Sequence, residues 1–88
     1  MIADHVLAWA RLPGPARLLS EIRQRLEAGR CGPRATIVLD ISPEQRHQIG
    51  QLLGVRWQVG DAPVSVQRLR EELASHGADL EELLTVLG

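Results

Sequence analysis

Apolar positions in the first third of the chain recur with a helical period. Between residues 15 and 28, a spacing of three and four residues predicts an amphipathic helix, which Gly29 ends. Its apolar stripe consists of Leu18, Leu19, Ile22 and Leu26. A shorter apolar group predicts a helix at 3–11. The LPGP segment at 12–15 separates the two helices, because its prolines and glycine cannot continue the first one, and Pro15 suits the first position of the second.

The middle of the chain changes to a strand-like pattern and then returns to a helical one. The β-branched apolar run at 35–39 is too short for a helix and predicts a buried strand. Ser42 then predicts a helix N-cap, with Pro43 in the first helical position and Gln45 completing a capping box. The helix that follows spans about 43–53. Its inward positions are Ile49, Leu52 and Leu53.

The last quarter of the chain predicts a second strand and two helices. The alternation of apolar and polar residues predicts a short strand near 62–65, which leads into a helix at 66–76. Gly77 ends that helix. Asp79 and Glu82 are spaced as a second capping box, which begins a final leucine-rich helix.

In chain order, these elements predict a single α+β domain over residues 1–88. It consists of about five short helices and a small two-stranded sheet, and the mixed pattern at 55–61 leaves that segment open. The helix between the two strands permits either parallel or antiparallel pairing. Trp9 and Trp57 are the only aromatic residues, so the core has to be built from aliphatic side chains.

Charge is distributed unevenly along the chain. All ten basic residues are arginine, and the formal net charge is −1. Residues 1–60 hold eight arginines against five acids, a balance of +3, whereas residues 61–88 hold two against six, a balance of −4. This excess is too small to predict nucleic-acid binding by itself, but it permits a local basic surface.

Cysteine content and hydropathy predict a cytoplasmic protein. Cys31 is the only cysteine, so an internal disulfide is excluded and an inert thiol in a reducing compartment is expected. The N-terminus lacks the basic region of a signal peptide. No apolar run approaches the roughly 20 residues that cross a bilayer. No membrane partner is therefore expected.

No set of residues indicates catalysis, a metal site or a cofactor. His5, His47 and His76 lie in three separate elements and lack the local spacing of a zinc site. The adjacent glutamates at 71–72 and 81–82 point about 100° apart on a helix, so they cannot act together as an acid–base pair. We therefore expect no enzymatic activity, no cofactor and no small-molecule substrate.

The arginines provide the candidate nucleic-acid contacts. Four of them fall within twelve residues that contain only Glu27 as a counter-charge: Arg23, Arg25, Arg30 and Arg34. They are interpreted either as contacts to DNA phosphates or as a solvated surface. Arg46 lies beside the apolar stripe of its helix, so its stem is expected to be partly buried. A structural role is favoured for Arg46, with contact to a ligand as the alternative.

The leucine-rich end of the chain provides the candidate partner contacts. A helix of two turns is marginal by itself. Its leucines are therefore expected to pack partly on the domain and partly on another protein or on a second copy of the chain. They are Leu80, Leu83, Leu84 and Leu87.

Three segments of the chain together resemble a known bacterial family. They are RLLSEIRQRLEAG at 17–29, ISPEQRHQIGQLLG at 41–54 and SVQRLREELASHGADLEELLTVLG at 65–88. Their order of helices, caps and Leu-Gly endings resembles the N-terminal domain of the JetD-like subunits of Wadjet type I plasmid-defence systems. Longer members of that family end in a Toprim-like domain, act as metal-dependent nucleases and are encoded beside an SMC-like ATPase and its kleisin-like partners. The resemblance implies the N-terminal part of such a chain, and no catalytic residue carries over to these segments.

Two functions from different classes follow. The leading hypothesis is a non-enzymatic module of a DNA-directed defence nuclease, which positions DNA or docks onto SMC-like partners. The alternative is a protein-interaction or dimerisation domain without nucleic-acid contact. The position of the charges separates them, since contact with DNA requires the arginines of 17–34 and Arg46 to share one face.

Overall fold

The computed structural model describes residues 2–29, 32, 35–38, 40–53 and 64–87, which form five helices and two short strands. In chain order they are α1 (Asp4–Ala10), α2 (Pro13–Glu27), β1 (Thr36–Ile37), α3 (Pro43–Leu53), β2 (Val64–Ser65), α4 (Val66–Ser75) and α5 (Leu80–Leu87). The predicted α+β class and the predicted order of elements are confirmed. Within the described ranges, no helix is both long enough and apolar enough to cross a membrane.

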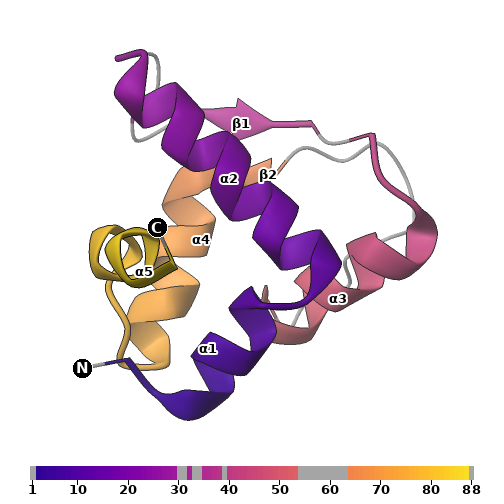
Figure 1. Cartoon of the computed structure of the whole chain (residues 1–88), viewed down its shortest axis with the longest axis vertical. Helices are drawn as coiled ribbons and strands as arrows, with labels where there is room; N and C mark the ends of the chain where they lie inside the picture. Colours follow the sequence, from indigo (N-terminus) through magenta and orange to yellow (C-terminus); the bar gives the residue numbers. More distant parts are fainter. Residues whose placement is uncertain (1, 30–31, 33–34, 39, 54–63, 88) are drawn as a thin grey trace.

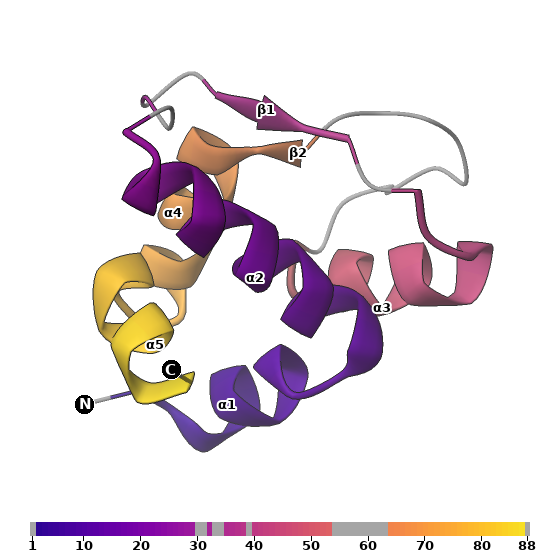
Figure 2. The same cartoon turned by 45° about the horizontal axis from the view of Figure 1, so that its top comes forward.

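Helix α2 runs diagonally across the molecule and forms its centre (Figure 1). Its first half packs against α1 and α3, and its second half passes β1. Helices α4 and α5 pack together as a pair, on the left of the views in Figures 1 and 2. The two strands form a ribbon along the top of both views.

Strands β1 and β2 pair antiparallel, the direction that the sequence left open. Ile37 lies opposite Val64, and both side chains are buried, as expected for the inward positions of a ribbon with a period of two. The described strands are shorter than the predicted ones at 35–39 and 62–65, parts of which lie outside the described residues.

Helix α2 begins two residues earlier than the sequence predicts. The predicted break between the two helices is confirmed, but its bounds at 12–15 are wrong: the chain turns at Arg11 and Leu12, and the helix begins at Pro13. The first four N–H groups of a helix have no partner within it, so Pro13 and Pro15 both fit into the first turn without loss of a hydrogen bond. The proline-glycine segment is therefore the start of a helix.

Gly14 in this first turn allows α2 to approach α3 closely. A Cβ atom added at Gly14 would lie 2.2 Å from the backbone carbonyl oxygen of Gln45, which is a severe overlap. The N–H group of Gly14 also donates a hydrogen bond to the side-chain oxygen of Gln48 at 3.0 Å. The α2–α3 contact thus depends on the absence of a side chain at this position.

Side-chain caps begin the three later helices. Ser42, Ser65 and Asp79 each accept a hydrogen bond from the backbone N–H three residues further on, at 3.3, 3.4 and 3.2 Å respectively. The predicted caps Ser42 and Asp79 are confirmed. The predicted helix stops Gly29 and Gly77 have φ angles of 69° and 74°, in the left-handed region that ends helices.

Among the described residues, the core is aliphatic except for Trp9. Its buried apolar side chains are Ile2, Val6, Trp9, Ala10, Leu18, Leu19, Ile22, Ile37, Ile49, Leu52, Val64, Val66, Leu69, Leu73, Ala78, Leu80, Leu83 and Leu84. The indole N–H of Trp9 donates to the backbone carbonyl of Gln48 at 3.0 Å. Leu26 departs from the prediction, because it is 36% exposed.

Candidate functional site

A groove of about 350 Å³ lies where α1 ends, α2 passes and α5 ends. Its lining residues are Ala10, Arg11, Ala16, Leu19, Ser20, Arg23, Leu84 and Leu87, and it is termed the α2–α5 groove. Figure 2 shows the end of α5 facing α1 and α2. The floor is mainly apolar, two guanidinium groups border it, and the described lining contains no carboxylate. Such a groove favours a ligand that combines an apolar side chain with negative charge.

Helical periodicity aligns the α2 part of this groove. Ala16, Ser20 and Arg23 are separated by four and three residues, so they lie on one face of α2. Ala16 and Ser20 have small side chains, which leave the space that the groove occupies. The same face therefore supplies both the open floor and one of the two positive charges.

Arg23 joins α2 to the end of α5. Its guanidinium Nη2 donates a hydrogen bond to the backbone carbonyl of Leu84. Leu84 lies in the last turn of α5, where carbonyl groups lack partners within the helix. A positive charge is also favourable at the C-terminal end of a helix dipole. Arg23 thus fixes one wall of the groove and contributes its charge to it.

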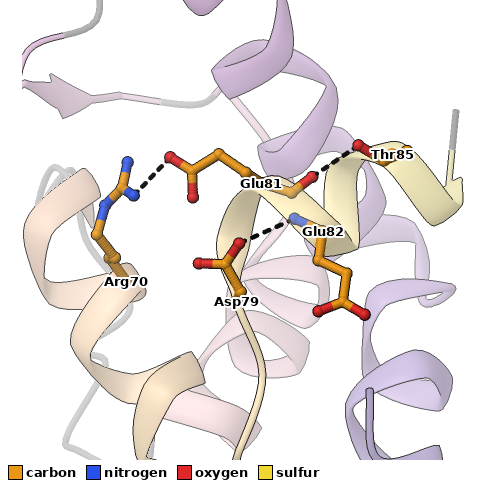
Figure 3. Close-up of polar contacts among 5 residues, drawn as sticks. All are labelled: Arg70, Asp79, Glu81, Glu82 and Thr85. Atoms are coloured by element: carbon orange, nitrogen blue, oxygen red, sulfur yellow. Dashed lines mark hydrogen bonds and ion pairs between the residues drawn. The ribbon is translucent and has the colours of Figure 1, made fainter. Parts of the chain in front are cut away.

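The start of α5 is held by a second set of polar contacts (Figure 3). Arg70 of α4 donates to the carboxylate of Glu81, Asp79 caps the helix at the N–H of Glu82, and the Thr85 hydroxyl donates to the Glu81 carbonyl at 2.9 Å. The hydrogen bond from Arg70 is the main cause that lowers the pKa of Glu81. Helix α5 is therefore fixed to α4 at its start and to α2 at its end.

The predicted arginine cluster does not form one surface within the described residues. Arg23 and Arg25 are two positions apart on α2, a rotation of about 200°, so they point to different sides of the helix. Arg25 lines a separate hollow of about 290 Å³ beside Glu21. Its Nε atom is buried without a hydrogen-bond partner in the described part of the chain. Arg30 and Arg34 lie outside the described residues.

Arg46 is buried in the fold. Its position beside the apolar stripe of α3 predicts a partly buried stem, and the whole side chain is only 7% exposed. It does not line the α2–α5 groove. In this conformation Arg46 offers a ligand almost no contact area, which agrees with the structural role that the sequence favours.

The four leucines of α5 divide between the core and the groove. Leu80 and Leu83 are fully buried within the chain, and Leu84 is buried while its edge lines the groove. Leu87 also lines the groove and is 37% exposed. Val86 is 57% exposed but lies outside the groove lining. The surface open to a partner is thus Leu87 with the edge of Leu84, a smaller area than the predicted stripe.

Sequence reasoning misses Arg11 and a pair of histidines. Arg11 is the C-cap of α1, and it joins the groove only because α1 packs against α2. Nε2 of His5 and Nδ1 of His76 lie 2.9 Å apart, although the two residues are 71 positions apart in the chain. Local spacing carries no signal for either feature, because both depend on tertiary packing.

Comparison of the chain with protein-family models, with curated proteins and with solved structures finds no match. Within the described ranges, no three or more His, Cys, Asp or Glu side chains gather as a metal-binding group. Function therefore has to be inferred from the groove and the charges around it. The resemblance to JetD-like subunits stays a prediction.

Proposed function

We propose that this domain is a protein-docking module whose α2–α5 groove receives an acidic, apolar segment of a partner protein. One observation supports this proposal above the others: an apolar floor is bordered by two guanidinium groups, without a carboxylate in the described lining. An apolar side chain of the partner would occupy the floor over Ala16, and a neighbouring carboxylate would pair with Arg11. Leu87 would complete the apolar rim.

The described arginines support protein docking better than contact with DNA. Binding to a phosphate backbone requires several cations on one surface. Arg23 and Arg25 point to different sides of α2, and Arg46 is buried. The leading hypothesis from the sequence, a DNA-positioning module, therefore depends on Arg30 and Arg34, which lie outside the described residues.

A different protein suits the groove better than a second copy of this chain. The acidic and leucine-rich segment of the chain is α5 itself. Its Leu80 and Leu83 are buried in the core, and Arg70 engages Glu81. A copy that offered this segment to its neighbour would have to open its own core. The proposed partner is accordingly another polypeptide. Where the resemblance holds, that partner is a subunit of an SMC-like complex in the cytoplasm.

The test measures binding between the purified domain and each protein encoded beside its gene, by isothermal titration calorimetry. Arg11→Glu reverses one groove charge, and Leu87→Ser removes the exposed apolar rim. Each is expected to weaken binding by about tenfold or more, as truncation of an interface anchor does.

Matched controls lie next to these positions. Arg17→Glu reverses an exposed charge on α2 outside the groove lining, and Val86→Ser removes an exposed apolar side chain beside Leu87. Both controls are expected to change the affinity by less than about threefold. Equal losses in the groove and control variants would contradict the proposal. So would binding to duplex DNA with no binding to any neighbouring gene product.

A further inference from the structure

Two histidines from opposite ends of the chain meet at the edge of a hollow. His5 lies in the first turn of α1, and His76 is the C-cap of α4. Nε2 of His5 and Nδ1 of His76 are 2.9 Å apart, with ring centroids 4.9 Å apart and ring planes at 65°. The pair and Trp9 line a hollow of about 390 Å³ together with residues of α3. Each ring thus directs one nitrogen at the other, and a single proton lies between them.

We propose that His5 and His76 chelate a divalent transition-metal ion of the copper, nickel and zinc class. With metal–nitrogen bonds of about 2.05 Å, two imidazole nitrogens at right angles on one ion are about 2.9 Å apart, and at the tetrahedral angle about 3.3 Å apart. The observed 2.9 Å matches the right-angle spacing. Square-planar and tetragonal coordination with that angle is typical of Cu²⁺ and Ni²⁺, and Cu²⁺ is the ion that nitrogen sites bind most tightly.

The rings have to rotate for the ion to replace the proton. In the hydrogen bond the two nitrogens point at each other, whereas in a chelate both lone pairs point at an ion beside the line between them. This requires a turn of up to roughly 45° at each ring for right-angle coordination. His5 is exposed and His76 is half-buried, and the adjoining hollow gives both rings space. Water would fill the other coordination positions, and Gln51 lines the same hollow.

The proposed site differs from the sequence-based expectation of no metal site, which considered only local spacing. It also has a mechanical consequence, since α1 and the end of α4 would be joined through one ion. An ion that binds the folded state alone stabilises that state by linkage. Thermal stability should therefore rise with the concentration of added metal.

Trp9 provides the test, because it lines the same hollow and a bound Cu²⁺ ion quenches nearby tryptophan fluorescence. The untagged Trp57→Phe chain retains Trp9 as its only tryptophan. Titration with CuCl₂ is expected to give saturable quenching. His5→Gln and His76→Gln are each expected to weaken the apparent affinity by about tenfold or more, since loss of an outer-shell contact alone costs 10–100-fold. The control His47→Gln removes an exposed histidine of α3 and should change the affinity less than about twofold.

Quenching that is equal in the parent chain and in the His5→Gln/His76→Gln double variant would overturn the proposal, and so would quenching that does not saturate. If circular dichroism shows that the variants unfold, the proposal is tested instead by nuclear magnetic resonance of the unmodified chain. Substoichiometric Cu²⁺ should then broaden the ring signals of His5 and His76 before those of His47. Equal broadening of all three histidines would reject the chelate.

Discussion

Among single residues, Gly14 determines how closely α2 and α3 pack. Gly14→Ala would bring a Cβ atom to 2.2 Å from the Gln45 carbonyl oxygen, so the two helices have to separate. We expect a loss of about 1–3 kcal/mol in the free energy of unfolding, as for other overpacked contacts. This exceeds the gain of at most about 1 kcal/mol that alanine has over glycine in a helix. Urea denaturation measures the change.

Gly32→Ala is the matched control for this substitution. Among the described residues, a Cβ atom at Gly32 would have no neighbour within 4 Å. Its unfolding midpoint should stay close to that of the parent protein. Equal midpoints for Gly14→Ala and Gly32→Ala would contradict the close approach of α2 and α3.

Ser42 contributes through a single hydrogen bond at the start of α3. Its Oγ accepts from the N–H of Gln45 at 3.3 Å. Ser42→Ala is expected to lower the free energy of unfolding by about 1 kcal/mol, because one N–H group in the first turn loses its partner. Thermal denaturation provides the measurement, with the exposed Ser75→Ala as the control. Unchanged melting together with lost partner binding would instead identify Ser42 as a contact residue.

Between helices, the Arg70–Glu81 ion pair makes the α4–α5 contact depend on pH. The hydrogen bond from Arg70 lowers the pKa of Glu81 below its ordinary value of 4.5. A carboxyl with a lowered pKa stabilises the folded state above that ordinary value, and this stabilisation is lost as the pH falls through the folded-state pKa. The Glu81 side chain is 52% exposed, so the pair contributes only about 0.2–1 kcal/mol.

Glu81→Gln should therefore destabilise the protein by that amount at neutral pH and have a smaller effect at about pH 3, because the stabilisation is progressively lost as the pH falls below 4.5 and towards the lowered folded-state pKa. Chemical denaturation at both pH values measures the difference. Adding Arg70→Gln to the Glu81→Gln variant should cause little further loss, because the pair is already broken. A destabilisation of equal size at both pH values would show that packing, and not charge, accounts for the effect.

Features that depend on neighbours along the chain could be predicted from the sequence, and features that depend on packing could not. Hydrophobic spacing identifies Leu18 and Ile22 as inward, and the capping pattern identifies Ser42. The sequence pattern places the start of α2 two residues too late, because proline can end a helix or begin one, and the first turn needs no N–H donors. The opposite directions of Arg23 and Arg25 follow from the helical period alone. The position of Arg11 in the groove requires the packing of α1 on α2.

Across the whole molecule, the distribution of arginines governs binding to nucleic acid. The described arginines of the predicted cluster do not share a face, so we expect no measurable binding to a labelled DNA duplex near 50 mM salt, a condition where roughly micromolar non-specific binding is readily detected. Fluorescence anisotropy measures this.

Measurable binding to duplex DNA would be an equally specific result. A dissociation constant of about 10⁻⁴ to 10⁻⁶ M, with an affinity that falls linearly on logarithmic scales as salt rises, would restore the DNA-positioning hypothesis. This conclusion would also require that glutamine substitutions at Arg23, Arg25, Arg30 and Arg34 remove most of the salt dependence of DNA binding. The same substitutions at Arg68 and Arg70, which lie among acidic residues, should have little effect.

The domain alone is expected to be a monomer in solution. Leu80 and Leu83 are buried within the chain, and among the described residues of α5 the exposed large apolar side chains are Val86 and Leu87. Sedimentation velocity over a range of protein concentrations measures the mass. A dimer that dissociates on Leu87→Ser, but not on Val86→Ser, would show that a second copy occupies the α2–α5 groove.

The core contains Ile2 from the start of this domain and Leu80 and Leu83 from α5, so the order of synthesis matters for its folding. A ribosome adds about 5–20 residues per second, and α1 to α4 are all made before α5. Until α5 is made, the nascent chain lacks Leu80 and Leu83, two fully buried side chains of the core. Stable folding therefore has to await α5. Every shorter nascent chain exposes apolar side chains of the core. Chaperones bind such exposed apolar surface, and proteases recognise it.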